Sequence, residues 1–311
     1  MTTSPAEAAE FIRSGRLAAF PTETVYGLGA DVFDAAAVER IFEAKRRPAD
    51  NPLIAHVGAV DQIPLLAREL SRDAERLIER FFPGPLTLVL PRAANVPDVA
   101  TAGLDTIGVR MPRHDLARLF LTAAATPVAA PSANLSGRPS PTTWQAVLED
   151  LDGRIDCILQ GEATEIGLES TVVDCSIDDA PVMLRTGAIS LEQLAEVVPS
   201  IRIYDPSAVD APVRSPGLKH RHYSPRARVH LCDAAVDPPT PLDAAYIGVT
   251  KPTASFRRAV VARDVDEYAR RLFSFFRECD AAGIAEIYCE SVDESGIGRA
   301  LMDRLRRAAV G

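Results

Sequence analysis

Short apolar runs alternate with capped amphipathic segments along most of this chain. Residues 52–58 (PLIAHVG) form an apolar run, and Ser71 then precedes a segment that places Leu77, Ile78 and Phe81 on one helical face. A serine before such a segment caps the first turn of a helix, whereas a short apolar run is typical of a buried strand. The alternation therefore predicts an α/β chain with a large twisted sheet.

The same signals recur up to about residue 204. Asp34 precedes an apolar helical stripe that ends before Pro48, and Ser190 with Gln193 forms a capping box that predicts a helix over 191–198. Ser140, followed by Pro141, predicts a further helix start. Further strands are expected within 17–20, 86–92, 106–112, 127–134, 157–161, 170–176 and 181–187.

The texture of the sequence changes near residue 204. Residues 205–228 hold four prolines and, from Arg214 onward, seven basic or histidine side chains, with little apolar periodicity. That composition is typical of a linker. Beyond it, strand and helix signals return. We therefore predict a larger domain over 1–204, a linker over 205–228, and a small α/β domain over 229–311.

Composition excludes several classes of protein. A net charge of −9 and 6% aromatic residues argue against a wide nucleic-acid-binding face. The five cysteines are odd in number and include no C-x-x-C pair, which argues against a disulfide scaffold or a zinc ribbon. No apolar run reaches the ~18 residues of a membrane span. We expect a soluble, cytoplasmic protein that contacts no membrane and has weak or no stable binding to nucleic acid.

The basic segment KRRPADNPL at 45–53 stands out in this acidic chain. Cations at a helix C-terminus are each stabilised by roughly 0.3–1 kcal/mol, so a structural role for Lys45, Arg46 and Arg47 is one interpretation. Three adjacent cations nevertheless repel one another, and the two prolines fix the turn that carries them. Because lysine and arginine both suit phosphate, the segment favours phosphate binding.

Other polar segments leave two interpretations open. PTETVYGLGAD at 21–31 and APSANLSG at 130–137 are either ligand-binding turns or capped loops. His56, in an apolar strand, is typical of a satisfied core residue, whereas Arg110 at a strand end needs either a protein carboxylate or a ligand anion. His220 and His222 form only half of a metal site, so no metal site is predicted in the protein itself.

Seven motifs in a fixed order resemble the YrdC-like threonylcarbamoyl-AMP synthases. The resemblance covers residues 5–204, and SPGLKHRHYSP at 215–225 is similar to the two-domain branch of that family. It implies a YrdC-like large twisted sheet with flanking helices, followed by a small Rossmann-like α/β domain. The motifs are PTETVYGLGAD, K-x-R…D-N-P-L, FPGPLTLVL, GVRMP, APSANLSGRPSPT, ESTVVD and LRTG.

The resemblance also implies a nucleotidyltransferase. L-threonine, bicarbonate or CO2, and ATP with Mg2+ would give threonylcarbamoyl-AMP and pyrophosphate, and a separate transferase would use the product to make N6-threonylcarbamoyladenosine in tRNA. Lys45 and Arg47 would be catalytic, by neutralising the leaving group. The implied ATP-binding residues are Lys45, Arg47, Asn51, Thr106, Ser132, Asn134, Ser140, Arg185 and Tyr223, the last as part of a lid. The implied threonine-binding residues are Thr24, His56, Arg110, Ala130 and Ser170.

Three alternatives remain at this point. The chain could be an RNA-binding module, a hydrolase that uses Ser132, or a regulatory protein that retains a nucleotide pocket. The motif around Ser132 lacks the G-x-S-x-G pattern of a nucleophile turn. His56 is a candidate general base, but a role in orienting the ligand fits it equally. The role of the C-terminal domain is left open.

Overall fold

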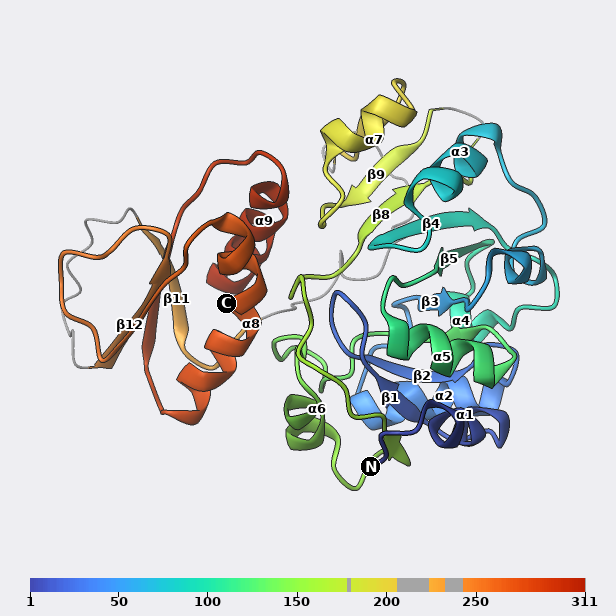
Figure 1. Ribbon diagram of the computed structural model, residues 1–311, viewed down its shortest axis with the longest axis horizontal. Helices are drawn as coiled ribbons and strands as arrows, with labels where there is room; N and C mark the ends of the chain where they lie inside the picture. Colours follow the sequence, from blue (N-terminus) through green and yellow to red (C-terminus); the bar gives the residue numbers. More distant parts are fainter. Residues whose placement is uncertain (178–179, 206–223, 233–242, 311) are drawn as a thin grey trace.

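The part of the chain that the structure describes forms two separate sheets, and the predicted α/β class is confirmed (Figure 1). The computed structural model describes residues 1–177, 180–205, 224–232 and 243–310. Within these residues a ten-stranded sheet is formed by segments up to Ile203, and a four-stranded sheet begins at Arg228. Most of the predicted linker, including Tyr223, lies outside the described residues.

The large sheet combines parallel and antiparallel neighbours. Its strand order is β10-β9-β8-β4-β5-β3-β6-β2-β1-β7, so its central strands come from distant parts of the chain. β3 runs parallel to β5, with His56 opposite Arg110 in the register. The strands are β1 (Ala18–Phe20), β2 (Gly27–Asp31), β3 (Ile54–His56), β4 (Leu86–Pro91), β5 (Thr106–Arg110), β6 (Val128–Ala129), β7 (Cys157–Ile158), β8 (Thr171–Asp174), β9 (Val182–Arg185) and β10 (Arg202–Ile203).

Of the four helix starts predicted from capping residues in this domain, three are confirmed. The side chains of Asp34, Ser71 and Ser190 each accept a backbone hydrogen bond at a helix start, as predicted. The helix expected from Ser140 begins instead at Trp144, because the Thr143 side chain makes the cap. The helices of this domain are α1 (Pro5–Arg13), α2 (Ala35–Lys45), η1 (Val60–Leu65, a 3-10 helix), α3 (Arg72–Phe81), α4 (Asp98–Thr101), α5 (Asp115–Ala124), α6 (Trp144–Leu151) and α7 (Leu191–Val197).

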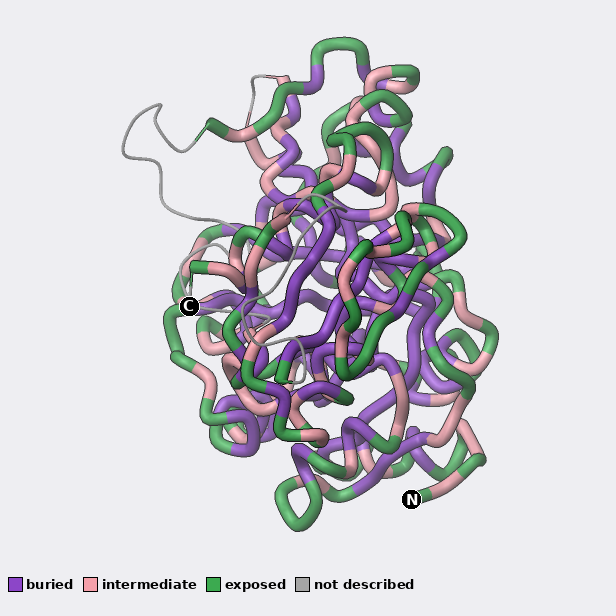
Figure 2. The backbone as a smooth tube through the Cα atoms, turned by 90° about the vertical axis from the view of Figure 1, so that its left-hand side faces the viewer, coloured by how far each residue is buried: buried purple, intermediate pink, exposed green. Residues whose placement is uncertain are grey.

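The central strands of the large sheet are fully buried. Every residue of β4 and β5 is buried, and Figure 2 shows the buried backbone concentrated in the centre of the molecule. The apolar face of α2, with Val38, Ile41 and Phe42, packs into the same core. This rigid centre supports the ends of β3 and β5, where polar side chains gather.

The small domain is a parallel sheet with two long helices. Its strands lie in the order β11-β14-β12-β13, the arrangement expected of a Rossmann-like unit. Figure 1 shows α8 and α9 between this sheet and the large domain. The elements are β11 (Arg228–Cys232), β12 (Ala244–Gly248), β13 (Arg258–Val261), α8 (Val265–Ala281), β14 (Glu286–Glu290) and α9 (Ile297–Ala309). Among the described helices, none combines the length and the apolar character needed to cross a bilayer.

Candidate functional site

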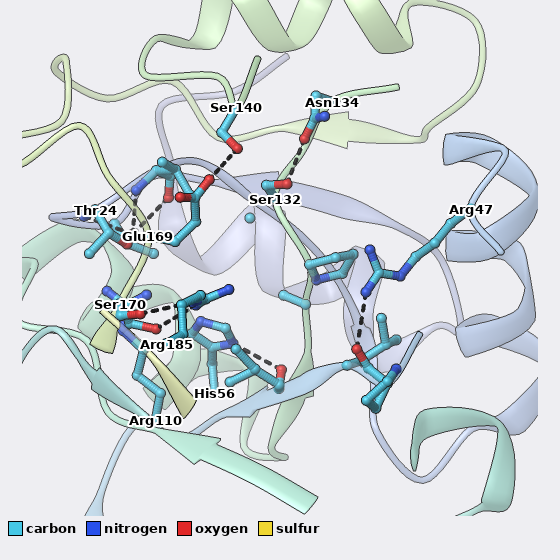
Figure 3. Close-up of a pocket in the computed structure, with 18 of the residues that line it drawn as sticks. Thr24, Arg47, His56, Arg110, Ser132, Asn134, Ser140, Glu169, Ser170 and Arg185 are labelled. Carbon is cyan, nitrogen blue, oxygen red and sulfur yellow. Dashed lines mark hydrogen bonds between the residues drawn. The ribbon is translucent and has the colours of Figure 1, made fainter. Parts of the chain in front are cut away.

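A pocket lies where several of the polar motifs meet. It encloses about 700 Å³, including space open to solvent. Figure 3 shows one group of side chains around Thr24, His56 and Arg110, and Arg47 at the far end of the pocket. The lining residues are Thr22, Thr24, Val25, Gly27, Arg47, Pro52, Leu53, Ile54, His56, Arg110, Ala130, Pro131, Ser132, Asn134, Arg138, Ser140, Glu169, Ser170 and Arg185.

All five residues predicted to bind threonine line this pocket. Thr24, His56, Arg110, Ala130 and Ser170 come from five separate segments of the large domain. The Ser170 hydroxyl forms a hydrogen bond of 2.8 Å with the hydroxyl of Thr87 on β4. The structure therefore brings the predicted set together, while the binding of threonine by these residues stays a prediction.

Arg110 is paired with a buried carboxylate. Its guanidinium lies 2.8 Å from Glu23, whose side chain is fully buried. The charge is thus balanced by the protein, one of the two possibilities that the sequence left open. Within the described residues, however, Nε and Nη2 of Arg110 and both oxygens of Glu23 lack a hydrogen bond of good geometry. Buried polar atoms without partners are costly, so this pair retains capacity to bind a polar ligand.

His56 lies beside this ion pair and is neutral at pH 7. Its burial, and secondly the positive charge of Arg110, lower its pKa to about 3. Its Nδ1 is 3.1 Å from the carbonyl oxygen of Ile54. A group with so low a pKa is a weak base at neutral pH, which favours the orienting role over general-base catalysis.

Arg185 closes the same end of the pocket. Its Nε donates to the backbone oxygen of Ser170 at 3.0 Å, and its Nη2 donates to the Ser170 hydroxyl at 3.1 Å. The side chain, which was predicted to approach the nucleotide, is buried and lines the pocket. It therefore fixes the orientation of Ser170 as well as adding positive charge.

The other end of the pocket is formed by the loop after β6 and by Arg47. Arg47 donates to the backbone oxygens of Asn51 and Pro52, at 3.3 and 3.1 Å. In the loop, the Ser132 hydroxyl donates to the side-chain oxygen of Asn134. The Asn134 amide nitrogen donates to the Leu135 oxygen at 2.8 Å. No described histidine hydrogen-bonds Ser132, so the hydrolase alternative finds no activating base here.

The three cations of the basic segment take different directions. α2 ends at Lys45, and Arg46 adopts a left-handed backbone conformation with φ of 51°, which turns the chain. Arg46 is exposed, whereas Arg47 lines the pocket. Three adjacent cations on one turn therefore do not act as a single cluster.

Lys45 lies behind the pocket loop, the segment 130–143 between β6 and α6. Its side chain is buried, and its ammonium donates to the backbone oxygens of Ser132 and Asn134. Burial, and then the charge of Arg47, hold its pKa well below the usual value. In this arrangement the ammonium supports the loop and does not line the pocket. Its predicted contact with ATP phosphates stays a prediction.

Two further residues predicted to bind ATP, Asn51 and Thr106, are absent from the pocket lining. Asn51 is buried next to Pro52, and its side-chain nitrogen lacks a hydrogen bond within the described residues. Thr106 begins β5, about 13 Å of extended strand from Arg110 at the other end. Tyr223 lies outside the described residues.

Four charged residues around the site were not singled out from the sequence: Glu23, Arg138, Glu169 and Arg304. Arg138 and Glu169 line the pocket, and Glu23 pairs with Arg110. Glu169 was visible only as the carboxylate that precedes Ser170 in a predicted site motif. Its ionic partner is Arg304 on α9, at 3.0 Å, and no local pattern links residues so far apart in sequence.

A second arginine of the small domain contacts the pocket loop. Arg277 on α8 donates to the Pro139 oxygen at 2.6 Å and to the carboxylate of Asp150 at 2.8 Å. Asp150 also accepts from the backbone nitrogen of Leu135 and from Arg138. Burial alone would raise the pKa of Asp150, but the arginine hydrogen bonds and charges hold it below its usual value.

Together, the mixed sheet and the two-ended pocket define an α/β protein with a pocket lined by arginines and small polar side chains. Two family models match the chain: one described as telomere recombination covers residues 10–187, and one described as the C-terminal domain of threonylcarbamoyl-AMP synthase covers residues 189–310. The threonylcarbamoyl-AMP synthase of Pyrococcus abyssi is 45% identical over 97% of this chain and 93% of its own length. That of Bacillus subtilis is 40% identical over 98% and 93%.

Solved structures agree with these relatives. The crystal structure of P. abyssi Sua5 complexed with L-threonine has a TM-score of 0.91 at 44% identity, and covers 98% of this chain and 94% of that one. Escherichia coli YciO has a TM-score of 0.56 at 25% identity, over 61% of this chain and 92% of its own. The chain therefore belongs to the two-domain branch of the threonylcarbamoyl-AMP synthase family, which confirms the resemblance in the motifs.

Proposed function

We propose that this protein is an L-threonylcarbamoyladenylate synthase, which makes threonylcarbamoyl-AMP and pyrophosphate from L-threonine, bicarbonate or CO2, and ATP. The observation that carries the proposal is the two-ended pocket, with a buried arginine at one end and an arginine-rimmed polar loop at the other. Two substrates that must react with each other can bind side by side in such a pocket. Enzymes gain much of their rate from holding reactants in this way.

The end with Arg110 suits an amino acid. The guanidinium of Arg110 has unused hydrogen-bonding groups for the carboxylate of threonine. The carboxylate of Glu23, 2.8 Å from that guanidinium, can balance the positive charge of the threonine amine. The hydroxyls of Thr24 and Ser170, with the neutral imidazole of His56, offer partners to the amine and the hydroxyl of the substrate. The P. abyssi relative was solved in complex with L-threonine, which supports threonine as the substrate.

The opposite end suits the nucleotide. Arg47 and Arg138 supply positive charge for phosphates, and Ser132, Asn134 and Ser140 supply hydrogen-bonding groups. Lys45 holds this loop from behind through two carbonyl groups. Asn51 and Thr106 do not line the pocket, and Tyr223 lies outside the described residues, so their contacts with ATP stay predictions.

The chemistry needs no covalent bond to the enzyme. The amine of threonine attacks CO2, a C–N bond forms, and the nitrogen loses a proton to give a carbamate. A carbamate oxygen then attacks the α-phosphorus of ATP as the bond to the bridging oxygen breaks, and pyrophosphate leaves with the negative charge. Arg47, which lines this end of the pocket, would stabilise that developing charge, the usual contribution of cations in phosphoryl-type transfer.

Mg2+ enters this proposal as a companion of ATP. Within the described residues there is no group of three or more His, Cys, Asp or Glu side chains that could hold a metal ion. Mg2+ is commonly bound by substrate phosphates and water with few protein carboxylates, so a pocket without such a group suits a metal that arrives on the nucleotide. The Mg2+ ion would offset phosphate charge there.

The product is a reactive mixed anhydride, which a separate transferase would use to modify tRNA. Mass spectrometry after incubation with ATP, L-threonine and 13C-bicarbonate tests the activity. We expect threonylcarbamoyl-AMP that carries one 13C atom, and pyrophosphate release that requires threonine. An Arg110→Met variant is the matched negative control. Pyrophosphate release that is unaffected by omitting threonine, without the labelled product, would refute the proposal.

A further inference from the structure

An arginine of the small domain reaches the wall of the pocket in the large domain. Arg304 lies on α9, and it is fully buried although it is charged. Its Nε donates to Glu169 at 3.0 Å, and its Nη2 donates to the backbone oxygen of Thr186 at 3.0 Å. Its Nη1 lies 2.8 Å from Asp303, its neighbour on the same helix. The guanidinium therefore links the two domains.

The second oxygen of Glu169 faces the pocket. It accepts a hydrogen bond from the hydroxyl of Ser140, and both residues line the pocket and are buried. Figure 3 shows this bond between Glu169 and Ser140. A continuous series of polar contacts thus runs from Arg304, through Glu169, to Ser140. Because buried polar groups lose water on folding, such a series fixes the orientation of each member.

The charge of Glu169 also needs an explanation. A carboxylate in the wall of a phosphate-binding pocket repels the ligand unless a cation neutralises it. Among the described residues, Arg304 is the cation that forms an ion pair with Glu169. Docking of the small domain therefore supplies the cation that balances the charge of Glu169.

We propose that Arg304 is a positioning residue for nucleotide binding, which acts by neutralising Glu169 and thereby holding Ser140 in place. The inference rests on the proposed function, because it takes the loop with Ser140 as the nucleotide end of the pocket. It gives the small domain a direct part in the site. Arg277, which holds Pro139 and Asp150 from α8, braces the same loop at a second point.

The test compares three variants of the full chain. Arg304→Met leaves Glu169 charged without its partner. In the double variant, Glu169→Gln removes the charge as well but keeps an oxygen that can accept from Ser140. Arg299→Met is the matched control, because Arg299 is also on α9 and forms an ion pair with Glu192 of the large domain at 3.6 Å, away from the pocket.

The readouts are ATP affinity by titration calorimetry and the separate KM values for ATP and threonine. Arg304→Met should weaken ATP binding by about 10- to 100-fold, the usual scale when a partner that orients a ligand-binding group is removed. The KM for threonine should change by less than about threefold. The double variant should recover most of the ATP affinity, and Arg299→Met should match the wild type.

A purely structural role of Arg304 predicts a different pattern. The inference is wrong if Arg304→Met keeps wild-type ATP affinity, or if the double variant binds ATP no better than Arg304→Met. It is also wrong if Arg304→Met unfolds while the double variant folds but does not bind ATP. Wild-type protein that binds ATP but makes no product would refute only the proposed function, and the affinities would still decide the inference. Wild-type protein that does not bind ATP would refute both.

Discussion

The buried imidazole of His56 should make the large domain less stable in mild acid. Its pKa is about 3 in the folded protein, against about 6.5 in an unfolded chain. Below pH 6.5 the unfolded chain therefore binds a proton that the folded protein does not, and the free energy of unfolding decreases as the pH falls from about 6.5 to about 3. Between pH 8 and pH 5, the contribution of this one residue is a loss of about 2 kcal/mol.

Urea unfolding at the two pH values measures this loss. The single tryptophan of the sequence, Trp144, lies in the large domain, so its fluorescence reports the unfolding of the domain that holds His56. A His56→Gln variant cannot gain the proton, and its stability should fall by about 2 kcal/mol less than that of the wild type. The carboxylates that titrate in the same range affect both proteins alike and cancel in the comparison.

His230→Gln is the control, because His230 is in the small domain on β11. That variant should keep the full loss of stability seen in the wild type. The reasoning fails if the stability of His56→Gln falls between pH 8 and pH 5 by the same amount as that of the wild type. His56 would then be either solvated or already charged in the folded protein.

Three further predictions concern the pocket and its supports. Arg47→Ala should cost about 2–4 kcal/mol of transition-state stabilisation, seen as reduced kcat/KM for pyrophosphate release; a value near wild type contradicts the assigned role. Lys45→Met leaves two buried loop carbonyls without a donor and should cost about 1–3 kcal/mol in urea unfolding, with weaker ATP binding; unchanged stability argues against the support role. Gly187→Ala would place a Cβ 2.3 Å from a backbone nitrogen of β8, so a Tm lower by several degrees is expected, and an unchanged Tm would show that the strand relaxes freely.

The sequence predicted most elements because their signals are local. Asp34, Ser71 and Ser190 mark helix starts that the structure confirms, since a capping side chain acts on the next turn of its own chain. The order of strands in the large sheet could not be predicted, because neighbours such as β4 and β8 are paired by tertiary packing. Ser140 shows the limit of a local signal: its hydroxyl bonds a distant glutamate and leaves the helix cap to Thr143.

The sequence predicted which residues belong to the candidate site better than it predicted where their side chains point. The position of Lys45 in the motif suggested phosphate binding. The left-handed backbone conformation of Arg46, however, makes the side chains of Lys45 and Arg47 point in different directions. A backbone angle of this kind in a non-glycine residue has no clear sequence signature. Arg304 was missed for another reason: it meets Glu169 only after two domains have docked.

The ion pair between Glu169 and Arg304 has a consequence for how the protein is made. During synthesis the large sheet can close once β10 has emerged, but α9 follows roughly 100 residues later, or about 5–20 s at the usual speed of translation. Throughout that interval the newly folded domain carries Glu169 without its guanidinium partner. From the proposed role of Arg304, we expect a nascent chain to bind nucleotide poorly until its final helix is in place.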